Sequence, residues 1–473
     1  MKFGETPDFG KDVDCQMEEM TLNEIALATG STCPDSIKDR KVDSICIDSR
    51  KLSPGCLFIA IRGENFDGHS FISQALEKGA VAALSSCPSD GDERVLTVKD
   101  TKRALLDLAR YYRRRFSLFL TGVTGSVGKT STKEMIYAIL SAKGKTLKTE
   151  GNFNNEIGMP LTMFRLDHSY QNAVVEMGMS NFGEISDLTH VCVPNAAVIT
   201  NIGVSHIEAL GSRENILKAK MEITESMEPN SPLILNGDDD LLRTVNHQTD
   251  RPIIYYGIDS GSDVTASDIQ TADGMTSFLI HYYGQSISAV IPTIGRHNVY
   301  NALAGFCVGL AADMEPEQIV RAMRLYKNAG LRQNTTVTEG VTVIADCYNA
   351  SPASMQAALD VICTMECTGR RICVFGDMLE LGDYSEEAHQ EVGRMVGRAN
   401  MDLLLCYGEE SRAIKRGAMM VGMKNVRHFA EQEELADFLV QTLRPGDAVI
   451  YKASRGMKLE RVIEMVDQKR RQA

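Results

Sequence analysis

Short apolar runs alternate with amphipathic stretches along most of the chain, which is the pattern of alternating strands and helices. In the first hundred residues the pattern predicts helices at 22–28 and 71–78 and strands at 44–49, 56–60 and 80–84. The alternation restarts near residue 116 and again near residue 331. A chain of 473 residues is too long for one hydrophobic core, so several domains are expected.

The restarts predict an α/β protein with three domains. A small α/β domain is expected at 21–115, a central parallel-sheet domain at 116–330 and a Rossmann-like domain at 331–473, after a polar extension at 1–20. In the last region, strands are predicted at 341–345, 371–375, 403–406 and 448–451, with helices at 354–365 and 431–440. Open α/β sheets bind ligands at the carboxyl ends of their strands, and polar residues follow several of these strands.

A glycine-rich stretch opens the central region. An apolar strand leads into Gly122, Gly125 and Gly128, and a helical pattern follows Lys129. Glycines let backbone N–H groups turn toward an anion, and a helix N-terminus adds partial positive charge. The strict phosphate-loop pattern would require glycine at 123, where Val123 stands, so the match is to a variant. The predicted nucleotide-binding loop comprises Gly125, Ser126, Val127, Gly128, Lys129, Thr130 and Ser131, with Lys129 on the outer phosphates and the Thr130 hydroxyl on Mg²⁺.

A lysine in the helix predicted at 213–227 faces the apolar side. Lys220 falls on one face with Ile216, Ile223 and Met227, whereas Lys218 lies about 160° away around the helix. Burying an unpaired ammonium group is costly, so Lys220 needs a reason to face inward. Two reasons stay open from the residues: an ion pair with a carboxylate or phosphate, which the residues favour, or a neutral amine that captures CO₂ as a carbamate ligand for Mg²⁺.

Four further positions are candidates for ligand contacts. Glu176 ends a strand predicted at 172–177, and His206 follows a strand predicted at 196–201. Each could be an ordinary polar residue, but together with Thr130 and Lys220 they supply the converging ligands that metal ions need. Asn298 and Asn301 could present amides to a base edge, but from this motif alone an ordinary helix start is the favoured explanation.

Composition narrows the class of protein. The net charge of −13 argues against nucleic-acid binding, and no apolar run approaches the roughly 18 residues that span a membrane. The arginine-rich stretch at 110–115 closes a helical pattern and is interpreted as a solvated helix end. Twelve cysteines without a C-x-x-C pair fit reduced thiols, so a cytoplasmic protein is expected.

From about residue 40 onward the chain resembles the Mur ligase family, and within it the ligases that add D-alanyl-D-alanine. The resemblance rests, in chain order, on TGVTGSVGKTSTKEM, EGNFNNEIGMPLT, VVEMGMSNFGEI, TNIGVSHIEALGSRENILKAKMEI, IGRHNVYNALAG, DCYNASPASM, FGDMLELG and KASRG. The Asn-Pro-Arg signature typical of the diaminopimelate- or lysine-adding relatives is not found in the sequence. The usual Lys-Gly-Ser-Arg tail motif carries Ala453 in place of glycine.

The resemblance implies roles for individual residues. Lys129, Glu176, His206, Lys220 and Arg332 would be catalytic, and Thr130, Glu176, His206 and carbamylated Lys220 would hold two Mg²⁺ ions. It therefore favours the carbamate over the plain ion pair at Lys220. Asn298, Asn301, Arg332 and Asp346 would contact ATP; Ser49, Arg50, Gly68, His69, Asn154 and Asn155 the UDP-sugar; and Asn349, Lys452, Ser454 and Arg455 the remaining substrate, the last three at the dipeptide carboxylate.

The implied activity is ATP-dependent addition of D-alanyl-D-alanine to UDP-N-acetylmuramoyl-tripeptide through an acyl phosphate. The resemblance implies a cytoplasmic monomer that acts on small molecules, without nucleic acid or membrane insertion. Two alternatives remain from the sequence. One is a related amide ligase, such as a folylpolyglutamate synthase or the ligase that adds the third peptide residue. The other is a nucleotide-binding protein without ligase activity, against which the set Lys129, Thr130, Glu176, His206 and Lys220 argues.

Overall fold

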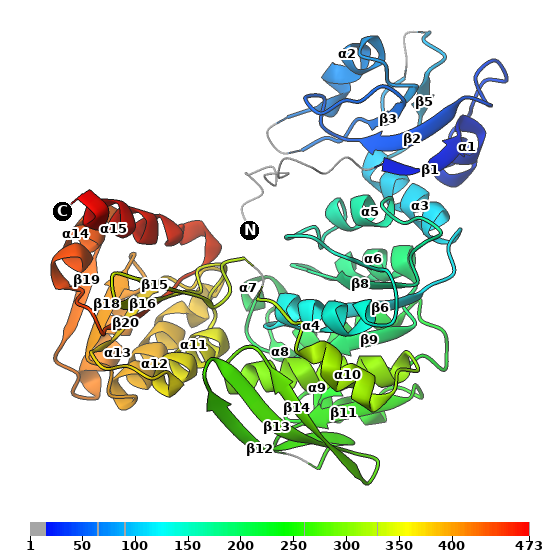
Figure 1. Cartoon of the computed structure of the whole chain (residues 1–473). Helices are drawn as coiled ribbons and strands as arrows, with labels where there is room; N and C mark the ends of the chain where they lie inside the picture. Colours follow the sequence, from blue (N-terminus) through cyan, green and yellow to red (C-terminus); the bar gives the residue numbers. More distant parts are fainter. Residues whose placement is uncertain (1–15, 64–65, 89–90, 260, 329, 473) are drawn as a thin grey trace. The chain divides into compact units, whose positions relative to one another are not determined.

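The computed structural model describes residues 16–472, apart from 64–65, 89–90, 260 and 329. Three β-sheets with flanking helices follow one another along the chain (Figure 1), so the predicted α/β class is confirmed. Residues 1–15 of the predicted extension lie outside the described part. Residues 16–20 of that extension are instead the greater part of β1 (Gln16–Thr21), the first strand of the first sheet.

The first sheet has five strands in sequence order, with β1 antiparallel to β2 and the others parallel. Its remaining strands are β2 (Lys41–Cys46), β3 (Cys56–Ile59), β4 (Ala82–Ser85) and β5 (Val95–Thr97). The helices of this region are α1 (Leu22–Thr29), η1 (Gly68–Phe71), α2 (Ile72–Glu77) and α3 (Thr101–Arg113). Thr21 and Glu24 form a capping box that fixes the start of α1. Strand β2 begins three residues before the predicted start at 44.

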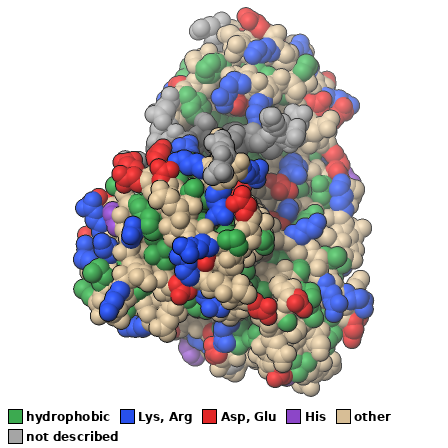
Figure 2. All heavy atoms as spheres, turned by 60° about the vertical axis from the view of Figure 1, so that its left-hand side comes forward, with side chains coloured by type: hydrophobic (Ala, Val, Ile, Leu, Met, Phe, Trp, Pro, Cys, Tyr) green, Lys and Arg blue, Asp and Glu red, His purple; other side chains and the backbone are tan. Residues whose placement is uncertain are grey.

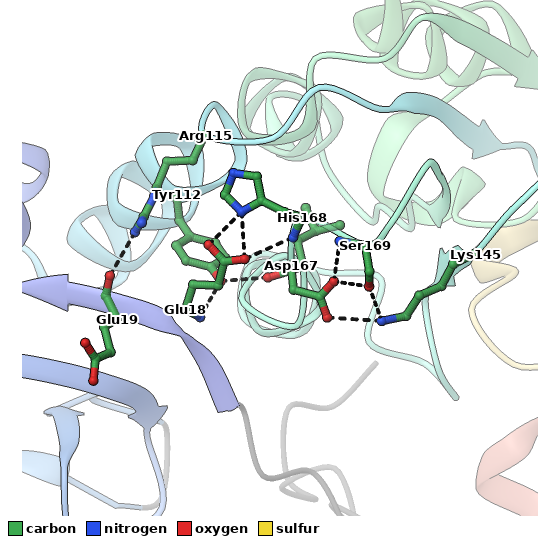
Figure 3. A network of polar contacts seen from close by, with 9 residues as sticks. Glu18, Glu19, Tyr112, Arg115, Lys145, Asp167, His168 and Ser169 are labelled. Atoms are coloured by element: carbon green, nitrogen blue, oxygen red, sulfur yellow. Dashed lines mark hydrogen bonds and ion pairs between the residues drawn. The ribbon is translucent and has the colours of Figure 1, made fainter.

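Hydrogen bonds join strand β1 to helix α3 and to the segment 166–168 (Figure 3). The Tyr112 hydroxyl accepts a hydrogen bond from the Glu18 N–H at 2.8 Å and donates one to the Leu166 carbonyl at 2.7 Å. The Glu18 carboxylate also accepts from the His168 N–H at 3.0 Å and lies 2.7 Å from His168 Nδ1. These contacts join the edge of the first sheet to the turn that precedes the central strand beginning at Asn172.

The Glu18 carboxyl makes this junction sensitive to acid. Partial burial raises the pKa of Glu18, but the side chain and N–H of His168 lower it further, so the net pKa lies below the usual 4.5. The carboxylate therefore stabilises the junction above pH 4.5, and this contribution is lost as the pH falls through the lowered value. We expect E18Q to accelerate amide exchange around Tyr112 about two- to five-fold at pH 7, and we expect this acceleration to decrease as the pH falls through the lowered pKa of Glu18. Amide exchange measured by mass spectrometry at pH 7 and at lower pH checks this expectation. E19Q is the control, because the Glu19 side chain pairs with Lys41. Equal acceleration at every pH would contradict the assigned role of the Glu18 carboxylate.

The second sheet has nine strands in the order β14-β13-β12-β11-β10-β9-β6-β8-β7. Its strands are β6 (Phe119–Thr124), β7 (Thr146–Lys148), β8 (Asn172–Glu176), β9 (Ala196–Ile199), β10 (Leu233–Asn236), β11 (Ile253–Gly257), β12 (Val264–Ala272), β13 (Met275–Tyr282) and β14 (Gln285–Ile291). Its helices are α4 (Lys129–Ser141), α5 (Gly158–Met163), α6 (Glu184–Cys192), α7 (Ile207–Leu210), α8 (Arg213–Met221), η2 (Glu222–Thr224), η3 (Leu242–His247), α9 (Arg296–Ala311) and α10 (Pro316–Met323). Strand β6 runs parallel to β8 and β9. The predicted helix at 213–227 ends its α-helical part at Met221 and continues as a short 3₁₀ turn.

The expectation of a parallel sheet throughout 116–330 is wrong for its last part. Strands β12, β13 and β14 form an antiparallel meander. Two-residue turns at Asp273-Gly274 and Tyr283-Gly284 connect them, and all four residues have positive φ. Turns with positive φ at both central residues match the twist of hairpin strands, and Asp-Gly is a common pair at such positions. The central sheet is therefore mixed.

The third sheet has the order β15-β16-β20-β17-β18-β19, with only β15 antiparallel to its neighbour. Its strands are β15 (Asn334–Thr338), β16 (Val341–Ala345), β17 (Arg371–Gly376), β18 (Leu403–Tyr407), β19 (Val426–Phe429) and β20 (Ala448–Lys452). Its helices are α11 (Pro352–Thr364), η4 (Gly382–Tyr384), α12 (Ser385–Arg398), α13 (Arg412–Met420), α14 (Gln432–Thr442), η5 (Arg455–Met457) and α15 (Glu460–Gln472). One apolar core lies between the sheet and α11–α13, and a second involves α14 and α15. Both faces are covered, as in a doubly wound fold.

Ala453, which departs from the usual glycine of the tail motif, is fully buried after β20 and packs next to Gly376 at the end of β17. A Cβ atom built on Gly376 would lie 2.8 Å from the Ala453 Cβ, which is closer than carbon atoms approach without a shift. The chain therefore accommodates the larger residue at 453 because the neighbouring strand ends in glycine.

We expect G376A to destabilise the third sheet by about 1–3 kcal/mol, the usual cost of overpacking a filled core. The double variant G376A/A453G should recover part of this loss, because the second change removes the opposing methyl group while the new Cβ still lies 3.2 Å from the Tyr407 carbonyl oxygen. Thermal unfolding of wild type, the two single variants and the double variant gives the coupling between the positions. Additive effects would show that the two side-chain positions do not share this space.

The chain divides into two compact units. One contains the described residues up to Thr124 with Leu140–Ile199 and Ala219–Leu233, and the other contains Gly125–Ile139, Thr200–Lys218 and the chain from Ile234 onward. This division runs through the predicted central region, so the boundaries at 21, 116 and 331 stay predictions. On the face shown in Figure 2, acidic and basic side chains are interspersed. No helix in the described part is both long enough and apolar enough to cross a membrane.

Candidate active site

The glycine-rich stretch forms the predicted strand–turn–helix. Strand β6 ends at Thr124 and helix α4 begins at Lys129. Between them Gly125 has φ +148° and Gly128 has φ +87°, conformations that side chains rarely adopt. The Lys129 ammonium folds back over the turn and donates to the Gly125 carbonyl at 2.7 Å. The turn has the local architecture of a phosphate cradle at a helix N-terminus.

The segment after β9 holds this turn in place. The Asn201 carbonyl accepts from the Ser126 N–H at 3.0 Å, and its side-chain oxygen accepts from the Val127 N–H at 2.9 Å. The Thr200 hydroxyl donates to the Val127 carbonyl at 2.6 Å. A Cβ atom on Gly125 would lie 1.9 Å from the Thr200 hydroxyl oxygen, so only glycine fits there. Asn201 and Thr200 support the loop and were not identified from the sequence, where they were merely the end of a strand.

Glu176 ends β8, and its position is set by pairing with β6, in register with Val123. The side chain is buried, and its Oε1 accepts a hydrogen bond from Asn154 Nδ2 at 2.8 Å. The Glu176 N–H donates to the Thr149 hydroxyl at 3.0 Å. Asn154 was predicted to contact the sugar nucleotide, and the structure places its amide against Glu176. Its neighbour Asn155 accepts from the Gly158 N–H at 2.8 Å, at the start of α5.

The predicted inward face of the helix containing Lys220 is confirmed. Lys220 is 1% exposed, and Ile216, Ile223 and Met227 are also buried, whereas Lys218 is exposed. An amine at this depth requires a compensating negative charge or loss of its proton. Glu176 and Lys220 belong to the first compact unit, and Thr130 and His206 belong to the second.

His206 precedes α7 and has a left-handed backbone, with φ +64°. Its Nδ1 lies 3.0 Å from the Glu380 carboxylate, in the loop between β17 and η4. The hydrogen bond from His206 is the main cause that lowers the pKa of Glu380 to about 2. Glu380 was not identified as a site residue, although it lies in the FGDMLELG motif that carried part of the resemblance.

The two predicted base-contacting asparagines lie on α9 and are connected to α4. Asn301 Nδ2 donates to Asn298 Oδ1 at 3.1 Å, and Asn301 Oδ1 accepts from the Thr132 hydroxyl at 2.8 Å. Asn298 also donates to Gln333 Oε1 at 3.3 Å. Next to Gln333, the Arg332 guanidinium carbon lies 4.3 Å from the centre of the Tyr348 ring. The structure thus joins the helix of the phosphate loop to the start of the third sheet through amide side chains.

Parallel pairing of β16 and β20 brings two predicted residues together. Ala345 of β16 pairs with Tyr451 of β20, so the next residues along each chain segment, Asp346 and Lys452, lie opposite each other. Their side chains form a buried ion pair at 2.6 Å. Lys452 Nζ also donates to the Asn349 carbonyl at 3.1 Å. Ser454 accepts from the Leu379 N–H at 2.9 Å, and Arg455 pairs with Glu460 at 2.7 Å. The predicted nucleotide residue Asp346 and the predicted dipeptide residues therefore share one strand edge.

The predicted sugar-nucleotide residues of the first sheet lie in two loops. Arg50 makes a two-pronged contact with Asp48, at 2.8 and 2.7 Å, and the Ser49 carbonyl accepts from Lys78 at 3.4 Å. Gly68 approaches the backbone closely, since a Cβ there would lie 2.7 Å from the Ile61 carbonyl oxygen.

His69 is fixed at both ring nitrogens. Its Nε2 accepts from the Ser86 N–H at 3.0 Å, so its Nδ1 carries the proton and donates to Asp67 at 2.6 Å. The backbone and side chain of His69 lower the pKa of Asp67 to about 2.

The donor set suits a magnesium ion bound together with a nucleotide. Mg²⁺ prefers oxygen ligands and is commonly held by one or two carboxylates plus substrate phosphates. The Thr130 hydroxyl in the first turn of α4 and the buried Glu176 carboxylate at the end of β8 are each an oxygen donor of this kind. The chemistry of the residues therefore fits this ion.

Three domain families match the chain in the order of its sheets. The Mur ligase family catalytic domain matches residues 41–113, the Mur ligase middle domain 123–309, and the Mur ligase glutamate ligase domain 331–455. The UDP-N-acetylmuramoyl-tripeptide–D-alanyl-D-alanine ligase of Bacillus subtilis (strain 168) is 38% identical over 454 residues, which cover 95% of this chain and 98% of the relative. The enzyme of that name from Escherichia coli (strain K12) is 36% identical over 435 residues, covering 91% and 95%.

Solved structures agree with the sequence matches. MurF from Acinetobacter baumannii has a TM-score of 0.89 at 32% identity, with 96% of this chain and all of that chain covered. MurF ligase from Thermotoga maritima in complex with ADP has a TM-score of 0.82 at 30% identity, covering 90% and 98%. Folylpolyglutamate synthase from Mycobacterium tuberculosis, at 16% identity and a TM-score of 0.61, shares the fold.

Proposed function

The chain belongs to the Mur ligase family, and we propose that it is the member that joins D-alanyl-D-alanine to UDP-N-acetylmuramoyl-tripeptide with the consumption of ATP. The observation that carries the proposal is the 38% identity to a ligase of that name across 95% of the chain. The confirmed strand–turn–helix with Lys129 at the helix start supports the nucleotide-dependent part of the reaction. The product would be the UDP-muramoyl pentapeptide used in peptidoglycan synthesis.

The residues of the chain have distinct tasks in this reaction. Backbone N–H groups of the turn from Gly125 to Gly128 and the ammonium of Lys129 would hold the phosphates of ATP. Bound Mg²⁺ would neutralise negative charge on the phosphates as the tripeptide carboxylate approaches, which is the main demand of phosphoryl transfer. Thr130 and Glu176 would hold one ion, and Glu176 and His206 the second. Lys220, as a carbamate, would bridge or orient these ligands.

After transfer, the acyl phosphate must meet the amine of the dipeptide and not water. Arg332 would add positive charge at the transferred phosphoryl group. Asn298 and Asn301 would hold the adenine side of the nucleotide. On the third sheet, Lys452, Ser454 and Arg455, with Asn349, would bind the dipeptide through its carboxylate. Ser49, Arg50, Gly68, His69, Asn154 and Asn155 would bind the sugar nucleotide.

The setting of the protein is part of the proposal. We propose three domains with the boundaries 21–115, 116–330 and 331–473, and a monomer that works in the cytoplasm on small-molecule substrates. Within the described residues, all eleven cysteines are free thiols, which suits a reducing compartment.

The test is phosphate release from ATP and Mg²⁺ with UDP-muramoyl-tripeptide, in the presence and absence of D-alanyl-D-alanine. Release that depends on the dipeptide, with a pentapeptide product by mass spectrometry, is the expected result. Release only with a diamino acid and the UDP-muramoyl-dipeptide would assign the chain to the preceding step of the series. Absence of release with every amine would overturn the ligase assignment.

A further inference from the structure

The contact between His206 and Glu380 connects two segments that are far apart in sequence. His206 lies in the loop after β9 of the central sheet, and Glu380 lies in the loop after β17 of the third sheet. The two side chains meet at 3.0 Å between Nδ1 and Oε2, and they are 23% and 34% exposed. The contact is thus neither deep in a core nor freely hydrated.

Both residues have backbones in the left-handed region, with φ +64° in each case. For a residue with a side chain this conformation is unfavourable and persists only where the surroundings impose it. Here the strain occurs on both sides of one hydrogen bond. Strain at both residues indicates that the surrounding structure fixes the direction of the two side chains at the expense of a relaxed backbone in each loop.

The two residues that precede Glu380 are both held by hydrogen bonds from their backbone N–H groups. The Met378 N–H donates to the Nε2 of His389 at 2.9 Å, and His389 is fully buried. The Leu379 N–H donates to the Ser454 hydroxyl at 2.9 Å. On the other side, Gly382, with φ +50°, lies so close to Glu208 of α7 that a Cβ would be 3.2 Å from its Cγ. The carboxylate is therefore presented to His206 by a firmly held loop.

The chemistry of the contact fixes which ring nitrogen of His206 is available. A carboxylate accepts the Nδ1–H proton, which leaves the lone pair of Nε2 pointing away from Glu380. Histidines that bind metal ions usually donate their other N–H to a carboxylate or carbonyl, which fixes the tautomer and the ring orientation. A histidine with the opposite tautomer would present a proton to the ion.

We propose that Glu380 is a positioning residue that holds His206 in the Nδ1–H tautomer, so that Nε2 is available to the Mg²⁺–nucleotide site. This rests on the proposed function, in which His206 is a ligand. Because Glu380 follows a strand of the sheet that also carries the proposed dipeptide residues, the region that binds the amine would also complete the metal site. Glu380 would act through His206 and would not touch substrate itself.

The tautomer is measured directly by long-range ¹H–¹⁵N NMR of the full-length protein without nucleotide, with the His206 ring signals identified from the H206Q spectrum. We expect the wild-type ring to be in the Nδ1–H form and E380A to shift it toward Nε2–H. E380Q should be intermediate, because its amide oxygen still accepts the hydrogen bond but has no charge. E409Q is the matched control, since Glu409 is an exposed carboxylate of the same sheet region that pairs with Arg412. An unchanged His206 tautomer in E380A would overturn the proposal.

Kinetics provide the second measurement. We expect E380A to lower kcat about 10- to 100-fold and to raise the Mg²⁺ concentration for half-maximal rate, with the KM for D-alanyl-D-alanine within about threefold of wild type. A higher KM for the dipeptide with an unchanged Mg²⁺ requirement would overturn the proposal and place Glu380 in the dipeptide site. The wild-type assay with D-alanyl-D-alanine separately tests the proposed function. A wild-type enzyme inactive on that dipeptide would defeat the function even if the tautomer shifts as expected.

Discussion

The K220A variant is expected to lose turnover by at least about 100-fold, and short carboxylates such as acetate or formate are expected to restore part of it. The reason is that Lys220 is almost fully buried on the face of its helix that carries apolar residues. Its head group therefore interacts with groups inside the protein and not with solvent. Loss of one preorganised charged group in an active site typically costs 10²–10³-fold in rate, about 2.7–4 kcal/mol. An added carboxylate could occupy the space of the proposed carbamate and supply oxygen atoms in its place.

The measurement is the rate of phosphate release in K220A over a range of carboxylate concentrations. K218A is the matched control, because Lys218 belongs to the same helix but is exposed, and it should keep the wild-type rate. A K220A enzyme with full activity in the absence of carboxylate would contradict the carbamate assignment. Mass spectrometry of the folded protein in bicarbonate adds a check, since carbamylation increases the mass by one CO₂.

The K129A variant is expected to lose about 10²–10³-fold in rate through a different step. Lys129 lies at the first position of α4, and its ammonium covers the turn by bonding to Gly125 and Ser126 carbonyls at 2.7 and 3.4 Å. In the proposed reaction the same ammonium would turn to the outer phosphates of ATP, where negative charge develops during phosphoryl transfer. Removing it leaves the backbone cradle in place but removes the mobile positive charge.

Nucleotide binding and phosphate release should therefore respond unequally in K129A. Affinity for ADP, measured by calorimetry, should fall less than the rate, because ADP lacks the γ-phosphate. K143A is the control, since Lys143 follows the same helix at its exposed end. Equal losses in ADP affinity and rate would indicate that Lys129 maintains the loop and does not act on the transferred group.

Local patterns predicted the parts of the fold and site that local chemistry determines. Glycine spacing identified the phosphate turn, and helical periodicity placed Lys220 inward. Strand β1 was missed because its sequence, QMEEMT, is polar in composition, although Met17 and Met20 are buried. The β12–β14 meander was not predicted although its turns include an Asp-Gly pair, because the expected alternation of strands and helices has no place for three consecutive strands.

The contacts between distant segments could not be read from the sequence. Glu380 meets His206 across 174 positions of the chain and Gln333 meets Asn298 across 35, and no periodicity links residues so far apart. Likewise, the pairing of Asp346 with Lys452 depends on β16 and β20 lying next to each other, which requires the strand order of the sheet. The residue type can indicate that a position is a candidate for a polar contact, but the topology of the sheets determines which candidates meet.

The contact between Gly376 and Ala453 also restricts how this sequence can evolve. There is room for one methyl group between the ends of β17 and β20, so alanine is tolerated at 453 while 376 remains glycine. The effect of a substitution at either position therefore depends on the residue at the other. Alanine at both positions is the disfavoured combination, since the two methyl groups would lie 2.8 Å apart, and glycine at either position relieves this contact. The alanine in the tail motif therefore raises the cost of any side chain at position 376.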